Sequence, residues 1–186
     1  MQILASPFFG VSGDFQPIAT TTVGAGGSNG SVTFSSIPQT FKHLQVRVLA
    51  RTDRASTLDV SYFYLNSDTT LSNYTLHGLR GDGASASSFG FSTAGGTGTQ
   101  SPTLPGNSLT AEMFGVFILD ILDYTNTNKN TTMRALGGLD YNGGGRVELI
   151  SGVWINTAAV TSISFASANA TEFLQYSSFA LYGIKG

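Results

Sequence analysis

The side chains that most often carry out chemistry in proteins are scarce in this sequence. It has two histidines and no cysteine among 186 residues, which leaves no thiol for catalysis, disulfides or zinc binding. His43 opens a segment with strand-like alternation and His77 lies inside another expected strand, so ordinary sheet positions account for both. There is no Walker-type phosphate loop and no His-x-x-x-His pair. We therefore predict no catalytic, cofactor-binding or metal-binding residues, and a protein that is not an enzyme.

Two carboxylates are the strongest exception to that reading. Asp120 and Asp123 flank the end of an apolar segment and are followed by the Asx-rich stretch 124–129, YTNTNK. A turn after an edge strand is the simplest interpretation, because Asp and Asn side chains bond to their own backbone in turns. A cation site built with asparagine oxygens is the second interpretation, although the spacing is not that of an EF-hand. A glycosidase pair is the third, and it would require one carboxyl with a raised pKa.

Arg80-Gly81-Asp82 spells the integrin-binding tripeptide. Such a short match arises often by chance, and Gly-Asp-Gly is common turn material. We interpret it as a turn.

Aromatic residues offer one more kind of site. Tyr62, Phe63 and Tyr64 are consecutive in an expected strand, so they must lie on both faces of a sheet. Aromatic rings on an outer face suit a protein interface or stacking on sugar rings. An interface is the better interpretation, because few acids and amides lie nearby in the sequence.

The composition also favours contact with other protein. Charged residues make up 11% of the chain, whereas about 25% is typical of soluble domains. Little charge repulsion then keeps copies apart. The net charge of -2 argues against binding to nucleic acid. Residues 1–10 do not resemble a signal peptide, and no run is long enough to cross a membrane, so we expect a soluble product of the cytoplasm with no membrane partner.

The elements that must position these residues are predicted to be strands. The segment 43–51 alternates, with Leu44, Val46 and Val48 on one face, which is the two-residue period of a half-buried strand. Asn29-Gly30 and Asn142-Gly143 are signals for type I′ hairpin turns. Strands are expected at 18–23, 31–37, 43–51, 58–65, 74–80, 112–122, 132–136, 146–155, 160–165 and 178–185. This number of strands, without a convincing helix, predicts an antiparallel β-sandwich of the jelly-roll type.

Two segments do not fit that pattern. We expect residues 1–17 to form an irregular N-terminal arm, and residues 18–186 to form the sandwich domain. Within the domain, residues 81–109 are rich in Gly, Ser, Ala and Thr and are predicted to be one long loop, which in a compact domain is usually functional.

The sequence as a whole resembles a virion structural module of tailed bacteriophages, of the kind found in cyanophages, in small head decoration (cement) proteins and in tail-fibre proteins. The resemblance runs from Ile18 to the C-terminus. It is carried by the segments 18–24, 32–47, 65–69, 73–74, 77–82, 121–129, 136–142, 152–157 and 176–186. It implies a virion protein without catalytic residues.

The resemblance leaves two functions open. Only 17 residues precede the module and none follow it, which favours a capsid decoration protein over a fibre with a long stalk. Its expected partners are the major capsid protein and further copies of itself, with a trimer as the first guess, on the outer surface of the phage head. The alternative is a tail-fibre protein that binds polysaccharide on the host surface. A carbohydrate-active enzyme that uses Asp120 and Asp123 is a third, weaker hypothesis.

Overall fold

The computed structural model describes residues 13–25, 30–91, 99–169 and 171–186. Within them the chain forms thirteen strands and one short 3-10 helix, η1 (Leu71–Asn73). The strands are β1 (Phe15–Thr22), β2 (Ser31–Phe34), β3 (His43–Ala50), β4 (Leu58–Asp59), β5 (Ser61–Leu65), β6 (Tyr74–Gly81), β7 (Ala86–Phe91), β8 (Leu104–Pro105), β9 (Gly115–Leu122), β10 (Thr131–Asp140), β11 (Gly145–Trp154), β12 (Ile163–Ser167) and β13 (Ser178–Ile184). In the described residues, no helix is long and apolar enough to cross a membrane.

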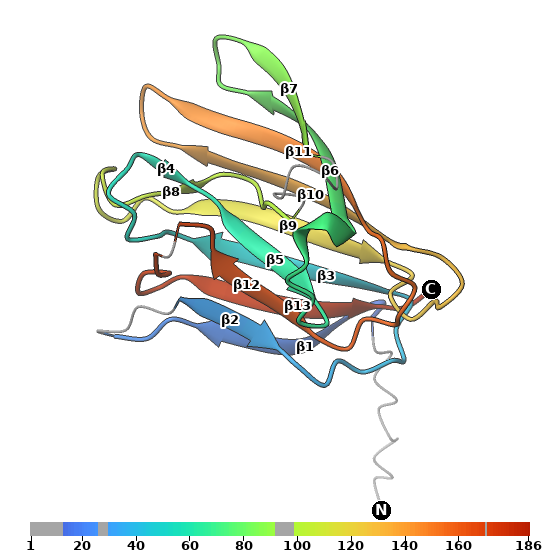
Figure 1. Cartoon of the computed structure of the whole chain (residues 1–186). Helices are drawn as coiled ribbons and strands as arrows, with labels where there is room; N and C mark the ends of the chain where they lie inside the picture. The colour runs from blue at the N-terminus through green and yellow to red at the C-terminus, as the bar shows by residue number, and fades with distance from the viewer. Residues whose placement is uncertain (1–12, 26–29, 92–98, 170) are drawn as a thin grey trace, which may run out of the picture.

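The strands form two main layers. The larger is an eight-stranded antiparallel sheet in the order β1-β13-β3-β9-β10-β11-β6-β7, and the smaller has the order β2-β12-β5. The smaller sheet lies against one face of the larger one (Figure 1). A two-stranded ribbon, β4-β8, completes the sheets.

The pairing of early with late strands has the arrangement of a jelly roll. β1 pairs with β13 in the large sheet and β2 pairs with β12 in the small one, so the chain crosses between layers in nested pairs. β3 then pairs with both β13 and β9. This topology confirms the predicted all-β sandwich of the jelly-roll type.

The core lies between the two layers. Alternate residues of the central strands of the large sheet point inward, as the burial of Leu44, Val46 and Val48 in β3 shows. Phe165 of β12 lies between rings of the large sheet, with its centroid 6.1 Å from that of Phe117 and 5.5 Å from that of Phe179. One shared hydrophobic core therefore holds the layers together.

The hairpin between β10 and β11 has the turn that its sequence predicts. Asn142 and Gly143 both have positive φ, at 54° and 105°. The Tyr141 N–H donates to the Gly144 carbonyl over 2.9 Å and closes the turn. This is the geometry of a type I′ turn, whose twist matches that of the flanking strands. Asn29, of the other predicted turn, lies outside the described residues.

The prediction of one irregular loop over residues 81–109 is wrong in part. The chain turns after β6 and returns along it as β7, and β8 pairs with β4. Thr99 and the segment 101–105 are buried.

A buried carboxylate holds this segment in place. Glu148 of β11, 2% exposed, accepts hydrogen bonds from the Thr103 N–H, from the Thr103 hydroxyl over 3.0 Å and from Arg80. Gly137 provides the space, because a Cβ there would lie 2.4 Å from Cβ of Pro102.

The predicted boundary of the N-terminal arm also shifts. Residues 15–17 belong to β1, where Phe15 pairs with Ile184 and Pro17 with Tyr182. Residues 1–12 of the predicted arm lie outside the described residues.

Candidate protein interface

Asp120 lies on the face of the large sheet that points away from the small sheet, here called the outer face. Its strand, β9, lies between β3 and β10 and is not the edge strand that was expected. Gln45 donates to one oxygen of Asp120 over 2.9 Å, and Arg134 donates to the other over 2.8 Å. The carboxylate is therefore held by its two cross-strand neighbours.

Asp123 lies in the turn after β9 and has cationic neighbours. Lys42 Nζ is 2.9 Å from its Oδ1, and Lys129 donates to its Oδ2. Hydrogen bonds from Lys129 and Lys42 lower the pKa of Asp123 to about 2. A general acid needs the opposite shift, so this carboxyl is a poor candidate for proton donation.

The segment after Asp123 confirms the predicted Asx turn. Asp123 has φ of 48° and its carbonyl accepts the Asn126 N–H over 2.9 Å. The Asn126 side chain accepts the Asn128 N–H over 2.8 Å. In the part of the chain that the structure describes, no group of three His, Asp or Glu side chains is arranged to hold a metal ion.

The two histidines occupy sheet positions, as predicted. His43 Nδ1 accepts the Asp123 N–H over 2.9 Å. His77 lies on β6, and the ring would contact a Cβ added at Gly90 of β7. His43 and His77 lie on strands separated by three others in the sheet order.

Arg80 and Asp82 have structural roles in the sheet and its turn. Arg80 pairs with the buried Glu148. Asp82 accepts the N–H groups of Ala84 and Ser85 over 2.9 and 2.8 Å, which shapes the turn between β6 and β7. This confirms that Gly81-Asp82-Gly83 is turn material.

The consecutive aromatics of β5 lie on both faces, as expected. Phe63 is buried in the core, whereas Tyr62 and Tyr64 are half-buried on the opposite face of the small sheet. Their ring centroids are 6.2 Å apart and the rings are tilted by 59°.

A larger apolar surface lies on the outer face of the large sheet. Its members are aliphatic side chains of four neighbouring strands, between 38% and 63% exposed, and they are called the aliphatic patch. The patch consists of Leu79, Val116, Ile118, Leu136, Val147 and Leu149.

The aliphatic patch is continuous because register aligns its members. Leu136 is the cross-strand partner of both Ile118 and Leu149, and Leu149 is the partner of Leu79. The next row runs from Val116 through Gly138 to Val147. These two rows carry no charged side chain on β9, β10, β11 or β6. Contiguous exposed apolar surface of this kind marks interaction sites.

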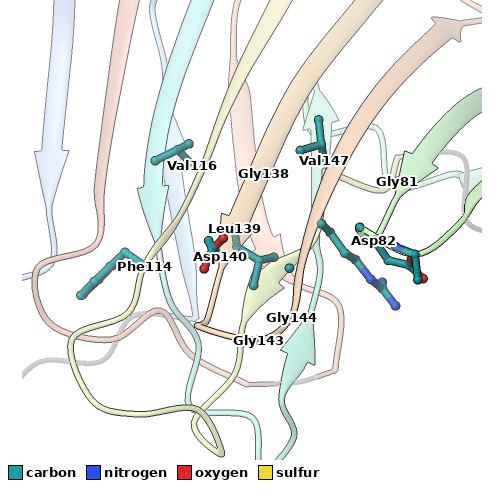
Figure 2. Close-up of a pocket in the computed structure, with 14 residues that line it drawn as sticks. Gly81, Asp82, Phe114, Val116, Gly138, Leu139, Asp140, Gly143, Gly144 and Val147 are labelled. Atoms are coloured by element: carbon teal, nitrogen blue, oxygen red, sulfur yellow. The ribbon is translucent and has the colours of Figure 1, made fainter.

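The second row contains a hollow. Gly138 has no side chain between Val116 and Val147, and glycines of the hairpin extend the depression to Asp140 (Figure 2). The hollow has a volume of about 930 Å³. Its walls are mainly apolar and glycine, and Asp82, Asp140 and Arg146 also line it. An apolar side chain of another protein can insert between Val116 and Val147.

The sequence prediction missed this surface, although part of its signal was present. In β9 the run Val116 to Leu119 is apolar on both faces of the strand, which is unusual for a strand with one face in water. The patch combines residues of four strands that become neighbours only through the order of strands in the sheet. That order cannot be predicted from the alternation within each strand.

No family model, curated protein or solved structure matches the chain. What the fold and this surface define is an all-β sandwich with a large apolar face on its outside.

Proposed function

We propose that this protein is a structural protein of a bacteriophage virion that decorates and stabilises the head shell. The observation that carries the proposal is the aliphatic patch, an uncharged apolar area on the outside of a folded sandwich. Binding of another protein to such a surface removes its apolar area from water, which is favourable. The resemblance of the sequence to phage virion modules is the reason for proposing a phage particle as the assembly to which the protein binds.

The mechanism is non-covalent. Packaged DNA pushes the capsid subunits apart, and an oligomer bound across their joints adds buried area that resists separation. The proposed partners are the major capsid protein and further copies of the chain, on the outer surface of the head. Catalysis has no part in this role.

The composition supports the same role. A surface with 11% charged residues gives little electrostatic repulsion between copies packed at high local density. Turn and loop polarity comes from Gly, Ser, Thr and Asn, whose neutral polar groups can hydrogen-bond to a neighbour without the desolvation cost of burying a charge.

The test is removal of the gene from the phage. We expect virions that adsorb normally to the host but have heads that break at a lower temperature, with sensitivity reversed by adding the purified protein. Gel densitometry of wild-type virions should show many copies per particle. A handful of copies, or loss of adsorption with heads of normal strength, would contradict the proposal.

The alternative function is a tail-fibre protein that binds polysaccharide on the host surface. Tyr62 and Tyr64 favour it, because neighbouring half-buried rings on a sheet can stack on sugar rings. Binding of host polysaccharide that is lost in the Tyr62→Ala, Tyr64→Ala double variant would support this function over decoration.

A further inference from the structure

We propose that the aliphatic patch binds a second copy of the same chain, sheet against sheet, about a two-fold axis that crosses β10 at the level of Gly137. The inference rests on the proposed function in one respect, that the patch is a protein interface. The second copy of the chain is then the partner that covers the aliphatic patch.

The symmetry follows from the register of β10. Outward-pointing residues of this strand are Arg134, Leu136, Gly138 and Asp140, in that order along the strand. The proposed two-fold axis lies midway between the outer face of one copy and the outer face of the other. It is perpendicular to the strands and level with Gly137, so it reverses the strand direction in the partner. Leu136 of one copy then lies over Gly138 of the other, and Arg134 over Asp140.

The shapes at these positions are complementary. Leu136 projects from the outer face with 53% of its surface exposed. Gly138 forms the floor of the hollow, between Val116 and Val147 (Figure 2). The partner's leucine enters this hollow, and symmetry makes the same contact twice.

The charges at the two ends of the contact are complementary too. The Arg134 side chain is 62% exposed although it pairs with Asp120 of its own chain. Asp140 is exposed at the other end of β10. The two-fold operation places the guanidinium of each copy opposite the Asp140 carboxylate of the other, at the rim of the interface, where charge pairs set orientation.

The available area matches what a stable dimer needs. The six strands from β3 to β7 in the sheet order span about 29 Å, and seven residues along β10 span about 23 Å. The two outer strands of this set form the rim around the patch, and β3 carries the exposed Arg47 next to Ile118 there. The footprint is then about 650 Å² in projection, before side-chain relief is counted. A standard interface buries about 800 Å² per partner, and aligned sheets pack in this way with interleaved side chains.

The first experiment is the mass of the purified full-length protein by sedimentation velocity over a range of concentrations. We expect a reversible species of twice the 19.5 kDa chain mass. A monomer at all concentrations would overturn the proposal, and so would a trimer, because three-fold symmetry cannot place Leu136 and Gly138 in reciprocal contact.

Two matched variants locate the interface. Leu136→Asp buries a charge in the hollow and should weaken the dimer by about 100-fold or more. Ile155→Asp is the control, since Ile155 is 44% exposed but lies beyond the end of β11. Equal loss of dimer in both variants, or an unchanged dimer in Leu136→Asp, would overturn the proposal. Circular dichroism verifies that both variants fold.

Cross-linking gives a readout that does not depend on affinity. The chain has no native cysteine, so Leu136→Cys introduces a single thiol. Packed sheets are about 10 Å apart, too far for a disulfide, so a short bis-maleimide is the suitable reagent. We expect a cross-linked dimer from Leu136→Cys and monomer from Ile155→Cys, and the reverse result would overturn the proposal.

Failure of this inference is distinguishable from failure of the proposed function. A monomeric protein that still stabilises phage heads overturns the dimer alone. If Leu136→Asp then abolished head binding, the shell protein would be the occupant of the aliphatic patch. A dimer that does not bind heads overturns decoration alone.

Discussion

Asp123 shows how neighbouring cations fix the charge of one half-buried carboxylate. Its pKa of about 2 lies below the ordinary 3.8, because Lys129 and Lys42 donate hydrogen bonds to the charged form. We predict that Lys129→Ala raises the pKa of Asp123 towards 3.8, with Lys42 holding it slightly below that value. The carboxyl carbon resonance of Asp123, followed by NMR against pH, measures the change.

The same shift has a consequence for stability. Because the folded pKa is lower than the unfolded one, the charged form contributes stability above about pH 4, and this contribution is lost as the pH falls towards 2. Asp82 is the internal control, since backbone N–H groups of Ser85 and Ala84 lower its pKa and Lys129 has no part in that shift. Equal movement of both pKa values in Lys129→Ala would contradict the assignment.

Tyr74 joins three segments through one buried hydroxyl. The hydroxyl donates to the Asp68 carbonyl over 2.9 Å and accepts the Leu65 N–H over 3.0 Å. We predict that Tyr74→Phe lowers the free energy of unfolding by about 1–2 kcal/mol, because the buried Leu65 N–H loses its partner. Urea unfolding measures the loss. Tyr176→Phe, at a residue 65% exposed, should leave the stability unchanged, and similar losses in the two variants would refute this role.

At the scale of elements, Glu148 attaches the segment 101–105 to the large sheet. Its carboxylate accepts two bonds from Thr103 and one from Arg80. Glu148→Gln replaces one acceptor oxygen with a donor amide, so a buried donor loses its acceptor. We predict a loss of about 2–3 kcal/mol in the free energy of unfolding, measured by urea denaturation, and faster hydrogen exchange at Thr103. The matched change Glu112→Gln, at an exposed residue, should cost little. Slow exchange at Thr103 in Glu148→Gln would show that other contacts hold the segment.

The strands that the sequence predicts are those with regular alternation. All ten predicted strand segments contain strands, because residues such as Leu44 and Val46 point into one core at a two-residue period. β7 was missed because Ala86–Phe91 is a mostly exposed edge strand that lacks this alternation. β8 was missed because its place depends on the bond from Thr103 to Glu148, 45 residues later. Local patterns carry no information on such a contact.

The candidate site is less predictable from sequence than the fold. The aliphatic patch combines residues as distant as Leu79 and Leu149, which are cross-strand neighbours. The hollow depends on the position of Gly138 opposite both Val116 and Val147. Each of these relations is a property of strand order and register, which alternation within one strand does not determine.

At the scale of the whole molecule, self-association predicts a thermal stability that depends on concentration. A folded chain binds its partner and an unfolded chain does not, so mass action favours folding at higher protein concentration. For a chain of this size, a 100-fold increase should raise the Tm by about 3 °C. Differential scanning calorimetry measures this shift. In Leu136→Asp the Tm should not vary with concentration, because the charge in the hollow at Gly138 prevents pairing, whereas Ile155→Asp should behave as the wild type does. The unfolding of a monomer is unimolecular, so its Tm does not depend on protein concentration. A wild-type Tm that stays constant over the same range would therefore show that the outer face does not pair in solution.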